Sequence, residues 1–466
     1  MGIASWIVHN NVPLADNGTV REGTCKVCTS WIVYKDVPLL SRCSTDKITR
    51  KMQVVTNIKG LVQVLPASVR KVCGKDMQAL KVLKNAFLLF DKGRIVDYGS
   101  MKKWAEMAAD YGRIKEIDAT GRFVFPAFCD SHTHIVYAGS REIEYNDKIR
   151  GLSYEEIAKR GGGILNSVDR LRKASENELF DSAWERLQEM CAYGTGAAEI
   201  KSGYGLDLKS EMKMLRVIAR LKEKSPLTIK ANFLGAHAVP REYIGRQTQY
   251  VDLIVKEMIP AIGKEKLADF VDVFCDKGFF TVKDTERILE AGARYGMRPK
   301  IHANELALSG GIQVGVKYKA LSVDHLEYVG KKEIAALLGS DTMPTVLPCA
   351  AFFLGMPLSP VRDMMAAGLP VAMASDFNPG SSPSGNMQFV MSLACVRYKM
   401  YPEEAVHATT INTACAMGVS DVLGSISKGK KANFFITKEI PTYEYMPYSF
   451  GNNKVEKVFL NGKQVR

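Results

Sequence analysis

The chain has 466 residues, of which 46% are hydrophobic and 24% are charged. These fractions are close to average globular usage and exclude a largely disordered protein. Lys and Arg exceed Asp and Glu by 63 to 50, giving a net charge of +13, but the basic residues are spread along the sequence. Without a basic stripe or tail, this charge predicts no nucleic-acid partner.

The chain shows no signs of a membrane or secreted protein. No apolar run of 18 residues occurs, and the N-terminus lacks a basic segment followed by an apolar one, so we expect no membrane association. The ten cysteines stand mostly alone within apolar segments, which is typical of buried thiols in a reducing compartment. We therefore expect a cytoplasmic protein.

Residues 1–53 read as an N-terminal extension of unknown role. Cys25 and Cys28, with Cys43 further on, resemble part of a zinc knuckle, but a fourth ligand at standard spacing is missing. The spacing therefore favours ordinary cysteines over a metal site.

Short strands are predicted on both sides of a long central region. Residues 54–121 contain strands at 61–64, 86–89 and 94–96 and a turn at 118–121. Residues 421–466 contain strands at 432–436 and 454–459 and an Asn-Gly turn at 461–462. Together the two segments predict one small flanking β-sandwich domain built from both ends of the chain.

The central region, residues 122–420, has eight apolar strand candidates, each followed by helical periodicity or a Gly-rich loop. The strands are predicted at 123–128, 195–200, 229–234, 270–274, 299–301, 321–323, 345–347 and 369–374, and helices at 209–223, 283–295, 331–338 and 360–367. This pattern predicts the α/β class and a (β/α)8 TIM barrel, in which functional side chains lie at the carboxyl ends of the strands.

Polar residues at three of these strand ends predict a metal centre. His132 and His134 point to the same side of an extended strand, while His302 and Asp376 follow the fifth and eighth strands. Each residue alone is as well explained by a structural histidine or a turn carboxylate, but the four together favour ligands of one ion. Three imidazoles and one carboxylate leave a position for water, and they suit one Zn²⁺ or Fe ion per subunit.

A second metal ion would need a bridging ligand such as a carboxylated lysine. Lys277 stands beyond the fourth strand and Lys201 belongs to the second strand, so a mononuclear site is predicted.

Two side chains near the predicted ligands and one of the ligands themselves are candidates for catalysis. Glu305 and Asp376 are expected to manage the proton of the attacking water, and His325 to polarise the carbonyl oxygen under attack. The sequence does not decide which of the three is the principal base. For Glu305 the alternative is a structural carboxylate at a helix N-terminus.

Several segments also resemble a known family. The Asp-x-His-x-His motif at 130–134, with His302, His325 and Asp376, resembles the amidohydrolases, metal-dependent hydrolases on a (β/α)8 barrel. Within them, six segments resemble the imidazolonepropionase family: 138–142, 161–164, 201–206, 234–240, 324–327 and 375–380.

That resemblance implies hydrolysis of the cyclic amide of 4-imidazolone-5-propanoate to N-formimidoyl-L-glutamate, a step of L-histidine degradation, by a homodimer. It implies the same four metal ligands, and an arginine suits the propanoate group. The implied substrate contacts are Arg141, Tyr204, His237, Glu305, Asn378, Gly380 and Ser381.

Two other functions remain open at this point. Another reaction on the same barrel, such as nucleobase deamination, would use the same ligands but would not require a site for a carboxylate tail. A non-catalytic assembly protein on this scaffold is the second alternative, although such proteins typically lose metal ligands and all four are present here.

Overall fold

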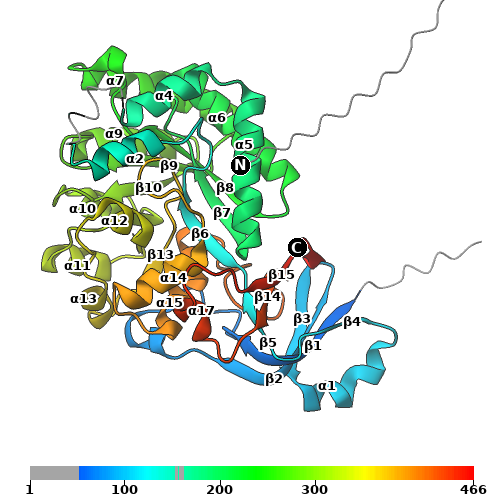
Figure 1. The fold of residues 1–466 in the computed structure, drawn as a ribbon. Coiled ribbons are helices and arrows are strands. Elements are labelled where there is room, and N and C mark those ends of the chain that lie inside the picture. The colour runs from blue at the N-terminus through cyan, green and yellow to red at the C-terminus, as the bar shows by residue number, and fades with distance from the viewer. Residues whose placement is uncertain (1–51, 153–155, 157–161) are drawn as a thin grey trace, which may run out of the picture. The chain divides into compact units, whose positions relative to one another are not determined.

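The computed structural model describes residues 52–152, 156 and 162–466, whose strands form two sheets (Figure 1). One sheet is parallel and carries the central region. The other is mixed and joins both ends of the described chain. The predicted cluster of Cys25, Cys28 and Cys43 lies outside the described residues.

The parallel sheet has eight strands that pair in chain order, which confirms the predicted barrel. A bridge between Thr133 and Phe377, with the amide of His134 donating to the Phe377 carbonyl at 2.9 Å, joins the first strand to the segment after the last. The strands are almost entirely buried, as expected where helices cover a parallel sheet. They are β6 (Phe128–Thr133), β7 (Thr195–Lys201), β8 (Thr228–Ala236), β9 (Phe270–Cys275), β10 (Arg298–Ala303), β11 (Ser322–His325), β12 (Met343–Val346) and β13 (Ala372–Met373).

Helices follow the strands, and capping residues fix where several of them begin. Ser175 and Thr281 form capping boxes with Glu178 and Asp284, and Asp207 accepts from the Ser210 amide. No helix in the described ranges is long and apolar enough to cross a membrane. The helices of this region are α2 (Glu142–Ile149), α4 (Ile164–Lys173), α5 (Glu176–Ala192), α6 (Leu208–Lys224), α7 (Gln247–Leu253), α8 (Ile259–Glu265), α9 (Val282–Ala293), α10 (Gly311–Lys317), α11 (Lys331–Leu338), α12 (Pro348–Leu354), α13 (Val361–Ala366), α14 (Met387–Val396), α15 (Pro402–Thr409) and α16 (Ile411–Ala416).

The second sheet joins strands from the two ends of the described chain, as predicted. In Figure 1 the blue strands β1 and β2 and the red strands β14 and β15 belong to this one sheet, in which β14 pairs antiparallel with β5. Apolar side chains from both chain segments, such as Leu88, Ile426 and Phe434, share its core. The elements are β1 (Gln53–Val62), β2 (Val82–Asp91), β3 (Arg94–Ser100), α1 (Met101–Met107), β4 (Lys115–Asp118), β5 (Arg122–Pro126), β14 (Phe434–Glu439), α17 (Tyr445–Tyr448), β15 (Val455–Leu460) and β16 (Lys463–Gln464).

The prediction for the first barrel strand was misplaced. The apolar run 123–128 contributes β5 to the mixed sheet, and the barrel strand β6 begins only at Phe128. Both strands are buried on both faces, so a continuous apolar run does not mark where the chain passes from one sheet to the other. As a result Asp130 and His132 lie within β6 rather than after a strand.

Candidate active site

A cavity of about 580 Å³ opens where the barrel strands end. Every site residue predicted from the sequence lines it except His132, which is fully buried. Its lining residues are His134, Arg141, Lys148, Ile164, Tyr204, His237, Phe274, Phe279, His302, Glu305, Leu306, His325, Leu354, Met356, Asp376, Asn378, Gly380 and Ser381.

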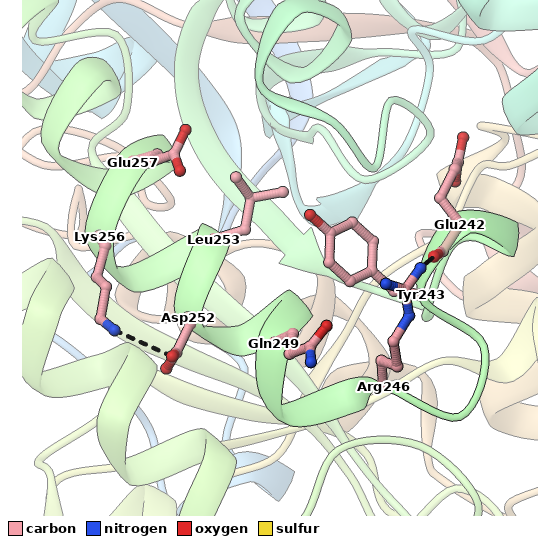
Figure 2. A pocket seen from close by; sticks show the side chains of 8 residues that line it. All are labelled: Glu242, Tyr243, Arg246, Gln249, Asp252, Leu253, Lys256 and Glu257. Carbon is pink, nitrogen blue, oxygen red and sulfur yellow. Dashed lines mark hydrogen bonds and ion pairs between the residues drawn. The ribbon is translucent and has the colours of Figure 1, made fainter.

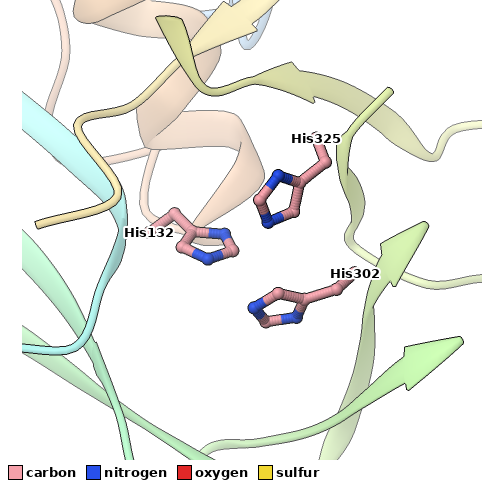
Figure 3. Close-up of side chains that lie close together, drawn as sticks. All are labelled: His132, His302 and His325. Carbon is pink, nitrogen blue, oxygen red and sulfur yellow. The ribbon is translucent and has the colours of Figure 1, made fainter. Parts of the chain in front are cut away.

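The predicted metal ligands lie together at the inner end of this cavity. The Nε2 atoms of His132 and His134 are 3.2 Å apart, and each lies 3.5 Å from Oδ1 of Asp376. His302 completes the group, with its ring centroid 4.5 Å from that of His132. Figure 3 shows His132, His302 and His325 projecting toward one space from β6, β10 and β11.

Buried carboxylates fix which nitrogen of two histidines faces that space. Nδ1 of His132 contacts Oδ2 of Asp324 at 2.7 Å, and Nδ1 of His302 contacts Oδ1 of Asp272 at 3.0 Å. With a proton on Nδ1, each imidazole turns the lone pair of Nε2 inward. Burial lowers the pKa of both histidines, so the rings stay neutral, as a metal ligand must.

Sequence reasoning missed a layer of buried charges beneath the histidines. Lys201 Nζ donates to Glu199 Oε1 at 2.6 Å and to Asp272 Oδ2 at 2.7 Å. Lys300 bonds to the other oxygen of Glu199 and lies 3.6 Å from Asp324 Oδ2. These side chains are almost completely buried. A usable signal was present, because charged residues inside apolar strands are costly unless they are paired.

The donor set fits one cation. Nε2 of His302 has no hydrogen-bond partner among the described residues, and the facing Nε2 atoms of His132 and His134 can share no more than one proton while both rings are neutral. Two overlapping groups have ligand atoms close enough for an ion: His132, His134 and Asp376, and His132, His302 and His325. Such a set of imidazoles and a carboxylate matches Zn²⁺ or Fe²⁺.

Glu305 and His325 lie side by side at the cavity wall. His325 Nε2 lies 3.5 Å from Glu305 Oε2. Burial raises the pKa of Glu305 to about 7. Burial alone would lower the pKa of His325, but the nearby carboxylates of Glu305 and Glu327 raise it to about 10. His325 is therefore cationic near neutral pH, while Glu305 can hold or release a proton there.

Glu305 stands in a loop and not at a helix N-terminus. The amides of Glu305 and Leu306 donate to Asp276 Oδ2 at 2.7 and 2.9 Å, and the next helix, α10, begins at Gly311. The alternative of a carboxylate that serves a helix dipole is therefore wrong, and Asp276 is the group that fixes this loop.

Strained backbone conformations cluster around the site. Four non-glycine residues at the ends of β10, β11 and β13 have positive φ: Asn304 (58°), His325 (84°), Leu326 (69°) and Asp376 (55°). Such conformations cost about 1 to 3 kcal/mol each and persist only where surrounding contacts hold them. The Asp376 amide donates to the His132 carbonyl at 3.0 Å, and Ser359 Oγ donates to the His325 carbonyl at 3.1 Å.

The loop after β13 is held by Asn378. Its Nδ2 donates to Ser381 Oγ at 2.7 Å, and its Oδ1 accepts from the amides of Gly380 and Ser381, both at 2.8 Å. Ser381 Oγ in turn donates to Asp376 Oδ2 at 3.2 Å. The hydrogen bonds of the Asn378 side chain are thus made within this loop and fix its shape.

Tyr204 and His237 form the wall beside His134. The His237 ring stacks on that of His134 with centroids 5.3 Å apart, and Nδ1 of His237 donates to the Gly203 carbonyl at 3.0 Å. A Cβ at Gly203, where φ is 104°, would lie 3.0 Å from that Nδ1 atom. Burial raises the pKa of Tyr204, so its phenol remains a neutral hydrogen-bond donor.

Arg141 lines the outer, more exposed part of the cavity: its side chain is 14% exposed, whereas those of His132, His134, His302 and His325 are 0 to 5% exposed. Its Nε and Nη2 donate to Glu144 Oε2 at 2.8 and 2.5 Å. Nη1 lies against Gly380, where an added Cβ would be only 2.2 Å from it. The structure therefore brings Arg141 and the loop after β13 together, and Gly380 leaves room for the guanidinium.

A second hollow, of about 340 Å³, lies along α7 (Figure 2). Several of its charged groups are paired with each other or with neighbours: Lys256 with Asp252 at 3.0 Å, Asp252 with Arg287, and Glu242 with Arg172. Groups that satisfy one another in this way offer no converging site, so the chemistry is assigned to the cavity at the strand ends, where the histidines and carboxylates converge.

The chain is similar in sequence to known proteins. The Amidohydrolase family model matches residues 123–465. The chain is 53% identical over 412 residues to the imidazolonepropionase of Christiangramia forsetii, covering 88% of this chain and 99% of that protein. It is also 53% identical to that of Flavobacterium johnsoniae over 410 residues, with the same coverage.

Solved structures share the fold. E. coli guanine deaminase gives a TM-score of 0.67 at 14% identity, covering 89% of this chain and 99% of that one. A triazine hydrolase variant gives 0.67 at 14% identity, covering 89% and 94%. At such low identity these likenesses concern the fold alone.

Proposed function

The chain belongs to the imidazolonepropionase family of the amidohydrolases, and we propose that its cavity opens the ring of 4-imidazolone-5-propanoate to give N-formimidoyl-L-glutamate. One observation carries the proposal: a cavity that joins an inner cluster of histidines and carboxylates to an outer cationic end. A substrate with a cyclic amide at one end and a carboxylate at the other matches both. A nucleobase has no carboxylate to place at the cationic end.

His132, His134, His302 and Asp376 would hold the metal ion. When bound, Zn²⁺ or Fe²⁺ supplies Lewis acidity, which makes water a nucleophile near neutral pH. Lys201 does not suit the role of a carboxylated bridging ligand, because the carboxylates around it raise its pKa and keep it an ammonium without a free lone pair. A single ion is therefore proposed.

Glu305 and His325 would manage protons and developing charge. Water adds to the ring carbonyl carbon, the bond from that carbon to the ring nitrogen breaks, and one water proton moves to the leaving nitrogen. A carboxyl group with a pKa of about 7 can accept that proton and return it. The cationic His325 beside it can donate a hydrogen bond to the oxyanion.

Arg141, Tyr204 and His237 would orient the substrate. The guanidinium of Arg141 suits the propanoate, and the neutral phenol of Tyr204 and the imidazole of His237 offer hydrogen bonds to the ring. Gly380 and Ser381 border the Arg141 end of the cavity through the loop that Asn378 shapes.

The deciding experiment is a turnover assay with 4-imidazolone-5-propanoate on protein of measured Zn and Fe content. Ring opening that scales with bound metal, and that is lost together with the metal in His302→Ala, is expected. Ammonia release from nucleobases in place of ring opening would favour the deaminase alternative. Purified protein that contains neither Zn nor Fe and turns over none of these substrates would favour an assembly role. A cytoplasmic location and a homodimer stay predictions, testable by fractionation and by light scattering.

A further inference from the structure

Helix α2 and the residue at its N-cap, Arg141, present three charged side chains along one side. Arg141, Glu144 and Lys148 are spaced i, i+3 and i+7, which places them on a common helix face. Arg141 and Lys148 both line the active-site cavity. Lys148 had no role in the sequence analysis.

The charge of Arg141 is largely cancelled before any substrate binds. Glu144 is only 6% exposed and takes the Nε and Nη2 edge of the guanidinium, the edge that could otherwise hold a carboxylate by two parallel bonds. The other oxygen of Glu144, Oε1, has no hydrogen-bond partner among the described residues. An anionic tail arriving here meets a neutralised arginine and a carboxylate that repels it.

Lys148 supplies the missing positive charge. Its ammonium makes no hydrogen bond or ion pair with another residue in the described ranges, and it is half-buried at the cavity wall. Burial and the nearby Arg141 lower the pKa of Lys148 by more than the nearby Glu144 carboxylate raises it. With Arg141 and Glu144 cancelling, the net charge of this group is one positive charge, which matches one carboxylate.

We propose that Lys148 is a specificity-determining residue that binds the substrate carboxylate beside the Arg141–Glu144 pair. The inference rests on the proposed function and deepens it. Recognition of the substrate carboxylate needs Lys148 as a second cation, and Arg141 chiefly orients that carboxylate. A role in which Lys148 merely steadies Glu144 would weaken binding of charged and uncharged ligands alike.

The test compares two ligands that differ only in tail charge. Binding of imidazole-4-propanoate and of its neutral propanamide to the metal-loaded protein is measured by calorimetry for wild type, Lys148→Met, Lys148→Arg and Arg150→Gln. Arg150 is an exposed cation just beyond the same helix, so it controls for general loss of charge. Thermal denaturation of each variant reports folding.

Lys148→Met is expected to weaken propanoate binding at least about tenfold, the effect of losing one hydrogen bond between charged groups. Propanamide binding should stay within twofold, Lys148→Arg should retain most of the propanoate affinity, and Arg150→Gln should match wild type. Equal weakening of both ligands, or none, would overturn the proposal even if wild type hydrolyses imidazolonepropanoate. Failure of wild type to open that substrate would refute the proposed function, whichever result the binding series gives.

Discussion

Asp272→Asn tests whether the buried carboxylates prepare the site for its ion. Asp272 Oδ1 lies 3.0 Å from His302 Nδ1, and Oδ2 accepts from Lys201 at 2.7 Å and from Asn232 at 2.9 Å. The side-chain amide of Asp272→Asn has one NH₂ donor group and one acceptor oxygen. If the NH₂ group faces Lys201, two donor groups meet. If it faces His302, Nδ1 of the ring must accept, so the ring proton moves to Nε2 and Nε2 loses the lone pair that binds metal.

Either arrangement weakens metal binding. Loss of an outer partner of a metal-binding histidine typically costs 10- to 100-fold in metal affinity, or about 1.4 to 2.7 kcal/mol. Leaving a buried lysine unpaired would cost a further 3 to 5 kcal/mol of folding stability, roughly. The expected loss of stability is smaller, because Lys201 keeps Glu199 at 2.6 Å.

The assay titrates metal-free protein with Zn²⁺ in competition with a chromogenic chelator. A matched control is Asp269→Asn, since Asp269 pairs with Lys230 at 3.0 Å and accepts from the Ala231 amide but touches no histidine. Both variants should melt earlier than wild type, and only Asp272→Asn should bind Zn²⁺ more weakly. A folded Asp272→Asn protein with wild-type Zn²⁺ affinity would refute the reasoning.

Three further substitutions probe separate parts of the site. Glu305→Gln should lower kcat by about 10² to 10⁴ while metal content stays at the wild-type level; loss of metal together with activity would show that Glu305 serves the ion instead. Gly380→Ala would place a Cβ 2.2 Å from Arg141 Nη1, so KM for the propanoate substrate should rise more than kcat falls; unchanged KM in steady-state kinetics would contradict the contact. Asp130→Ala removes the carboxylate that accepts from both the amide and the hydroxyl of Ser375, and thermal denaturation should report a loss of about 1 to 3 kcal/mol; an unchanged Tm would argue against that anchor.

The sequence predicted the barrel because apolar residues recur with different periods in its strands and its helices. The helix predicted at 331–338 is found at those residues, and the one predicted at 209–223 differs by one residue at each end. Hydrophobicity failed where two buried strands follow one another at 122–133, since it reports burial and not the identity of the partner strand. The pairing of β5 with β1 and β14, both far away in the sequence, separates them.

Within the site, the alternation of side chains along the strands could have predicted the buried lysines and carboxylates beneath the histidines. Lys201 follows Glu199 by two residues, and His302 follows Lys300 by two, so each pair projects from the same side of its strand. That Lys201 also meets Asp272 depends on the closing of the barrel, which no local pattern contains.

His325 reaches the cavity against the alternation of its own strand. On β11, Asp324 points into the barrel, where it contacts His132, so an extended continuation would turn His325 outward. The φ of 84° at His325 breaks that alternation and brings its ring 5.6 Å from that of His132. The strain thus places adjacent residues on one side: Asp324 beneath the histidines, and His325 above them beside Glu305. A straight strand offers only every second residue to the site, and the left-handed turn lets one short strand contribute both its supporting carboxylate and its cation.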